Sequence, residues 1–114
     1  MSLHATYRDS GDVTVVDLGG RIVLGDGSAL LRKTVCQLLD DGRTKIVINL
    51  ADVKYIDSSG IGELVHAYTS AKTRGGELKL LHLNKKVRDL LQITKLYTVF
   101  DVYSDEAAAV LSFR

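Results

Sequence analysis

The hydrophobic pattern of residues 46–74 changes from a continuous apolar run to helical spacing, and this order restricts the chain to few folds. Residues 46–50 (IVINL) are nearly continuous apolar, which is typical of a central parallel strand covered on both faces. Residues 61–74 follow, with apolar side chains at helical spacing, and residues 78–83 supply another apolar run. A strand, a helix and a strand in this order predict a βαβ unit with a right-handed crossover. The sequence therefore predicts an α/β fold.

Composition indicates an ordinary soluble domain. The 114 residues, 46% hydrophobic and 25% charged, are expected to form a single domain over 1–114. Fifteen basic and fourteen acidic residues give a net charge of +1 without long charged blocks, so direct binding to nucleic acid or membrane is not expected. No apolar run approaches the roughly 18 residues of a membrane span. The single cysteine, Cys36, rules out an internal disulfide and suits the cytoplasm.

The first third of the chain predicts a hairpin and a helix. Residues 4–8 and 13–18 are expected to be short strands joined by a turn at residues 10–12. The glycines at 19–20 interrupt the second strand, which residues 21–23 either continue or bend. A helix is expected to open at residues 25–28, with Gly42 just past its end.

The last third predicts two further helices around a final strand. Asn84 is expected to cap a short helix, and residues 99–103 to form the last strand. Ser104 is expected to cap the final helix. The whole pattern predicts one mixed β-sheet, with an opening hairpin and then parallel strands, layered with about four α-helices.

Residues 55–62 (YIDSSGIG) carry the strongest functional signal, because they join the central strand to the next helix. Free backbone N–H groups and the positive end of a helix can receive an anion there. Gly60 and Gly62 would each cost about 1 kcal/mol relative to alanine, which indicates a close approach by a phosphate, a partner protein or the neighbouring strand. An N-cap role for Asp57 or Ser58, without any ligand, is the alternative interpretation.

A helical wheel centred on the apolar stripe separates the side chains of this helix. It places Ser58 near the margin of the buried side. It expects five side chains to point away from the sheet: Ser59, Glu63, His66, Ser70 and Arg74.

The order Asp57-Ser58-Ser59-Gly60-Ile61-Gly62, after the strand at residues 46–50, resembles the central motif of the STAS domain family. The family is named after sulfate transporters and anti-sigma factor antagonists. The resemblance extends over nearly the whole chain, including the glycines at 75–76 and residues 90–96. One difference is Lys95, where members often have glycine. If the helix ends in a left-handed residue at this position, the backbone of Lys95 would be strained.

The chain is similar to stand-alone members of the family, and the resemblance implies a partner switch without catalysis or a cofactor. Ser58 would be the phosphorylation site, with Ser59 as the second choice. The unphosphorylated chain would bind an anti-sigma factor that is also a serine kinase, and so free a sigma factor. Phosphorylation would release the chain, and a PP2C-type phosphatase would restore the serine. The resemblance also implies a cytoplasmic monomer or weak dimer. The expected partner contacts are Asp57, Ser59, Gly60, Gly62, Glu63 and His66.

Other functions fit the residues less well or stay open. A serine hydrolase lacks support, because Ile56 replaces the first glycine of Gly-x-Ser-x-Gly and His66 lies about two helical turns beyond Ser58. Three scattered histidines predict no metal site. Residues 58–62 or 25–28 could hold a nucleotide phosphate, although neither is a P-loop. The leading alternative is a STAS scaffold, or an accessory subunit of a stress-sensing or lipid-transport complex.

Overall fold

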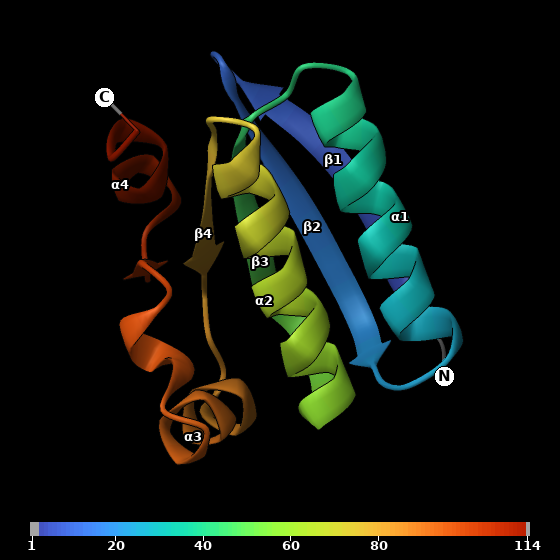
Figure 1. Ribbon diagram of the computed structural model, residues 1–114. Helices are drawn as coiled ribbons and strands as arrows, with labels where there is room; N and C mark the ends of the chain where they lie inside the picture. The colour runs from blue at the N-terminus through green and yellow to red at the C-terminus, as the bar shows by residue number, and fades with distance from the viewer. Residues whose placement is uncertain (1–2, 114) are drawn as a thin grey trace.

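The sheet has five strands in the order β1-β2-β3-β4-β5 (Figure 1). The computed structural model describes residues 3–113. The strands are β1 (His4–Ser10), β2 (Val13–Ile22), β3 (Lys45–Ile56), β4 (Glu77–Leu81) and β5 (Val102–Tyr103). β1 pairs with β2 antiparallel, and every later pair is parallel. The predicted mixed sheet with an opening hairpin is confirmed.

Helices cover both faces of the sheet unequally. α1 (Asp26–Asp40), α2 (Ser58–Thr73) and α3 (Lys85–Ile93) share one core with Ile46 and Ile48 of β3, whereas Val47 packs with α4 (Glu106–Leu111). Because successive side chains of a strand point to opposite faces, α4 lies on the face opposite the other three helices. Figure 1 shows α1 and α2 side by side in front of the sheet.

β3 runs further than predicted, and β2 follows the predicted alternative in which the strand continues beyond its two glycines. β3 pairs with β4 only through Asn49, and it then continues beside β2 as far as Ile56. β2 likewise continues through Gly19 and Gly20, where the register shifts. The second half of β3 mixes two charged residues with buried Val53 and Ile56, and its other residues are exposed, so its sequence lacks the continuous apolar run of residues 46–50. This extension carries the chain to the start of α2.

The C-terminal segment differs from the prediction at two points. The last strand, β5, has only two residues. Residues 99–101, which were predicted to belong to it, follow a 3-10 turn, η1 (Leu96–Thr98), and are not strand. Asp105, rather than Ser104, caps α4, and its side chain accepts the N–H of Ala108 at 2.9 Å. An N-cap side chain reaches the N–H two or three residues ahead, which favours Asp105. Asn84 caps α3 as predicted.

Arg8 joins the first two strands to the last helix. Its guanidinium contacts Asp17 of β2 (Nε–Oδ2 2.8 Å) and Glu106 of α4 (Nη2–Oε1 2.6 Å). These hydrogen bonds from Arg8 hold the pKa of both carboxyls below their ordinary values. α4 is therefore fixed to its face of the sheet by charge as well as by packing.

Lys95 follows the C-cap residue of α3, Thr94, and adopts the left-handed conformation, with φ 61° and ψ 24°. The strain expected from its sequence position is confirmed. Left-handed backbone brings Cβ close to the following carbonyl oxygen, and only glycine escapes this cost.

We expect Lys95→Gly to raise the free energy of unfolding by about 0.5–1 kcal/mol. Relief of about 1–2 kcal/mol of left-handed strain exceeds the cost of about 0.5–1 kcal/mol for the greater freedom of glycine in the unfolded chain. Urea denaturation measures the change. Lys33→Gly, on the exposed side of α1, is the control and should lose about 1 kcal/mol. A Lys95→Gly variant no more stable than wild type would contradict the expectation.

Candidate functional site

Asp57 holds the start of α2 against the connection between β2 and α1. Its Oδ1 accepts the N–H of Gly60 at 2.9 Å, which caps the helix. Its Oδ2 accepts the N–H of Leu24 at 3.3 Å. The backbone N–H of Asp57 donates to the carbonyl of Ile22 at 3.3 Å. The N-cap role is thus confirmed for Asp57, and the same carboxylate also fixes the neighbouring loop.

The two serines that follow lie in different surroundings. Ser58, the first residue of α2, is exposed, and its hydroxyl makes no hydrogen bond to any residue that the structure describes. Ser59 is half-buried, 3.3 Å from the hydroxyl of Ser28 on α1. Because Ser28 donates its own hydrogen to the carbonyl of Val23 at 2.9 Å, Ser59 must be the donor to Ser28.

This arrangement corrects the helical wheel. The wheel placed Ser59 outward and Ser58 near the buried margin, but Ser59 faces α1 and Ser58 faces solvent. The wheel referred only to the sheet below α2, whereas α1 packs beside the first turn. Ser58 is therefore the accessible hydroxyl of the pair.

Gly60 and Gly62 of the motif lie in different surroundings. A Cβ on Gly60 would lie 2.4 Å from the carbonyl oxygen of Ile22, so β2 itself makes the close approach. A Cβ on Gly62 would meet nothing within 4 Å. Gly62 is exposed, so internal packing does not explain why it is a glycine.

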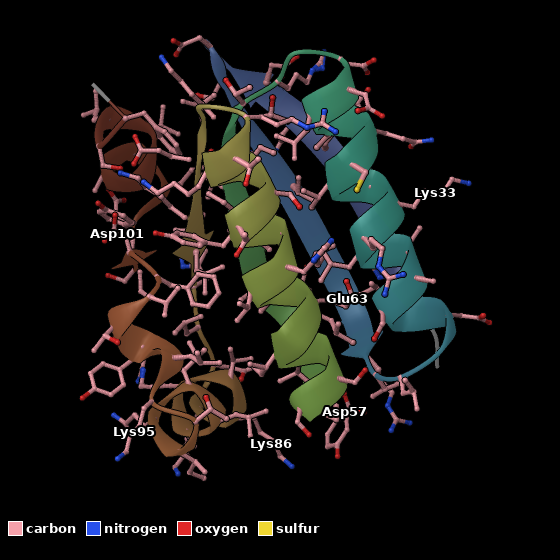
Figure 2. The ribbon with its side chains drawn as sticks, in the orientation of Figure 1. Lys33, Asp57, Glu63, Lys86, Lys95 and Asp101 are labelled. Atoms are coloured by element: carbon pink, nitrogen blue, oxygen red, sulfur yellow. The ribbon has the colours of Figure 1, made fainter. Side chains whose placement is uncertain are left out.

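The carboxylate of Glu63 forms an ion pair that joins α2 to α1. Arg32 of α1 donates to both of its carboxylate oxygens, with Nε–Oε1 at 3.2 Å. This pairing lowers the pKa of Glu63, against the opposing effect of desolvation. The Glu63 side chain is only 11% exposed and lies on the α1 side of α2 (Figure 2). His66, one turn further on, is exposed.

The predicted site residues thus fall into two groups. The exposed group is Ser58, Gly62 and His66. The group held in internal contacts is Asp57, Ser59, Gly60 and Glu63. Partner contact by members of either group stays a prediction.

Sequence reasoning missed three contributors from the β2–α1 connection and from α1 itself: Leu24, Ser28 and Arg32. Leu24 is 79% exposed beside the motif. The only sequence signal for these contacts was Gly27-Ser28 at the start of a helix. The same two residues were equally compatible with a phosphate-binding loop. The parallel pairing of β2 with β3 brings the ends of both strands to the same edge of the sheet.

Packing also accounts for the second glycine, Gly27, of the loop at residues 25–28. A Cβ on Gly27 would lie 2.8 Å from the carbonyl oxygen of Arg21, so α1 packs closely on β2 there. No group of three or more His, Cys, Asp and Glu among residues 3–113 is placed to hold a metal ion. Within the same residues, no helix is long and apolar enough to cross a membrane.

Replacing Asp57 should separate its two structural roles. We expect Asp57→Ala to lower the free energy of unfolding by about 1–2 kcal/mol, because it removes the cap and leaves the N–H of Leu24 without its acceptor. Asp57→Asn should lose less, since it keeps one acceptor for Gly60. Thermal and urea denaturation measure both. Asp52→Ala, at an exposed aspartate of β3, is the control. A loss no larger than that of the control would contradict these roles.

The chain matches known proteins along nearly its whole length. It is 36% identical over 110 residues to the anti-sigma-B factor antagonist of Listeria monocytogenes, covering 93% of this chain and 91% of that protein. It is 28% identical over 110 residues to the anti-sigma-B factor antagonist of Bacillus subtilis, covering 96% and 99%.

A solved structure and a family model agree with these relatives. A crystal structure of a Thermotoga maritima protein, 28% identical, has a TM-score of 0.89 and covers 96% of this chain and 94% of that one. The family model described as "STAS domain" matches residues 4–109. On this match and on its fold, the chain belongs to the STAS domain family.

Proposed function

We propose that the chain is an anti-sigma factor antagonist and that phosphorylation of Ser58 controls its binding to a partner. The observation that carries the proposal is the free, exposed hydroxyl of Ser58, next to a Ser59 hydroxyl held by Ser28. The names of the Listeria and Bacillus relatives support the general role.

In the proposed cycle the chain is a substrate and a switch. The unphosphorylated form binds an anti-sigma factor that is also a serine kinase, and a sigma factor is released. The kinase transfers the γ-phosphoryl group of ATP to the Ser58 oxygen, which loses its proton, and ADP leaves. A PP2C-type phosphatase hydrolyses the phosphoserine and restores the hydroxyl.

The first turn of α2 can carry a phosphate without loss of the fold. Asp57 accepts the N–H groups of Gly60 and Ile61, and the first two N–H groups of the helix have no intrahelical acceptor. The helix dipole favours an anion there by about 0.3–1 kcal/mol. Because Ser58 is exposed, its phosphate stays in water, and the core is unchanged.

The same phosphate has a different effect at an interface. It adds about −1.5 to −2 charges next to the carboxylate of Asp57, under a partner surface fitted to a neutral hydroxyl. Every 1.4 kcal/mol lost weakens binding tenfold, so a penalty of about 3–4 kcal/mol releases the partner. The switch therefore acts on docking.

Ser58 variants test the proposal with the cognate kinase and ATP. Mass spectrometry should place the phosphoryl group on Ser58 in wild type and in Ser59→Ala, and should find none in Ser58→Ala. In calorimetry, Ser58→Ala should bind the kinase like wild type, whereas Ser58→Asp should fold normally and bind at least tenfold more weakly, a loss of about 1.4 kcal/mol. Equal affinity of both variants, or phosphorylation elsewhere, would refute the proposal.

The two glycines supply a second test of the docking face. Gly62→Ala should raise the free energy of unfolding by about 0.5–1 kcal/mol, since its methyl group meets open space. It should nevertheless weaken kinase binding, because the methyl group stands where the partner lies. Gly60→Ala should instead lose about 1–3 kcal/mol of stability by collision with Ile22. Unchanged kinase affinity in Gly62→Ala would remove Gly62 from the interface.

A further inference from the structure

Two positive side chains contact the ring of Tyr55. The Cζ of Arg21 and the Nζ of Lys86 each lie 5.0 Å from the ring centroid. Arg21 is the register partner of Tyr55 across β2 and β3, whereas Lys86 comes from the first turn of α3. Neither has a carboxylate within ion-pair distance among the residues that the structure describes. This cluster therefore carries unbalanced positive charge around an exposed aromatic ring.

A groove between the end of β3 and α3 shares Tyr55 and Lys86 with this cluster. It has a volume of about 460 Å³. Its lining residues are Tyr55, Ile56, Lys85, Lys86, Asp89, Leu90 and Ile93. Ile93 is 77% exposed, although Val87 and Leu91 of the same helix are buried. The groove thus has apolar walls and a cationic rim.

The carboxylates nearby are already engaged. Asp89 pairs with Lys85 at 2.8 Å across one turn of α3, which balances that lysine. Asp57, two residues beyond Tyr55, accepts backbone N–H groups with both oxygens. The charges of Arg21 and Lys86 are left for an anionic group from outside the chain.

The groove also lies next to the proposed phosphorylation site. Ile56 lines it and leads through Asp57 into Ser58. Figure 2 shows Lys86 and Asp57 at the same end of the molecule. A stable interface covers about 800 Å² on each partner, so a kinase domain that reaches Ser58 must also cover surface around it.

We propose that this groove is a second anchor for the protein that docks on Ser58, and that it receives an apolar side chain flanked by carboxylates. The apolar side chain packs on Leu90 and Ile93, and the carboxylates pair with Arg21 and Lys86. The inference rests on the proposed function. It adds α3 to the docking surface and states the chemistry of the partner segment.

Charge reversal and polar substitution test the groove. Lys86→Glu should weaken binding of the kinase that phosphorylates the chain by tenfold or more, and should reduce the dependence of that affinity on salt. Ile93→Ser should weaken binding about fivefold at every salt concentration. Calorimetry at low and physiological salt measures both, with folding checked by circular dichroism.

Matched controls exist elsewhere on the surface. Lys33→Glu on α1 reverses an exposed lysine far from the groove, and Leu111→Ser on α4 removes a side chain that is 57% exposed. Both should bind within twofold of wild type. If Ser58→Asp loses binding while Lys86→Glu and Ile93→Ser bind normally, the groove proposal is wrong and the proposed function stands. If wild type neither binds the kinase nor is phosphorylated, both are wrong.

Two other occupants would also overturn the proposal. If Ile93→Ser abolishes self-association in sedimentation velocity but leaves kinase affinity unchanged, the groove holds a second copy of the chain. If Lys86→Glu changes only the titration of phosphoserine 58 in ³¹P NMR, the cations hold the chain's own phosphate. A loss of kinase affinity in both groove variants, with neither of these effects, supports the anchor.

Discussion

The geometry of the candidate site depends on the two hydrogen bonds that the carboxylate of Asp57 accepts. One oxygen caps α2 and the other holds the β2–α1 connection, so two segments distant in sequence are fixed around Ser58. The hydrogen bond from Ser59 to Ser28 and the ion pair of Glu63 with Arg32 continue this attachment along α1 and α2. Ser58 is left as a free hydroxyl on a rigid support. This support suits the proposed modification of Ser58, because the hydroxyl can change without disturbing the contacts that hold the fold.

Much of the fold could be predicted from the sequence, because the deciding signals are local. The apolar residues 46–50, the cap at Asn84 and the glycine at 42 each act within a few residues of the chain, and the structure confirms them. The second half of β3 was not predicted, and β5, although predicted within residues 99–103, is shorter than expected. Most of their residues are at least partly exposed, so the sequence carries no continuous apolar run there, and pairing with a neighbouring strand makes them β-structure.

The candidate site shows the same division. The motif from Asp57 to Gly62 is contiguous, so its position at a helix start could be predicted from the sequence. The serine orientations were predicted wrongly, because they depend on α1, whose packing beside α2 no local pattern reveals. The cluster of Arg21, Tyr55 and Lys86 draws on three separate elements and leaves no signal in any one of them.

The attachment of α4 through Arg8 makes one side of the molecule sensitive to acid. Asp17 and Glu106 have pKa values below their ordinary ones, so their contribution to stability is present at neutral pH and is lost as pH falls through those lowered values. Protonation would leave the six-residue α4 held mainly by the small cluster around Ala109. As the solution is acidified below those lowered values, α4 should therefore lose the charged part of its attachment to the sheet.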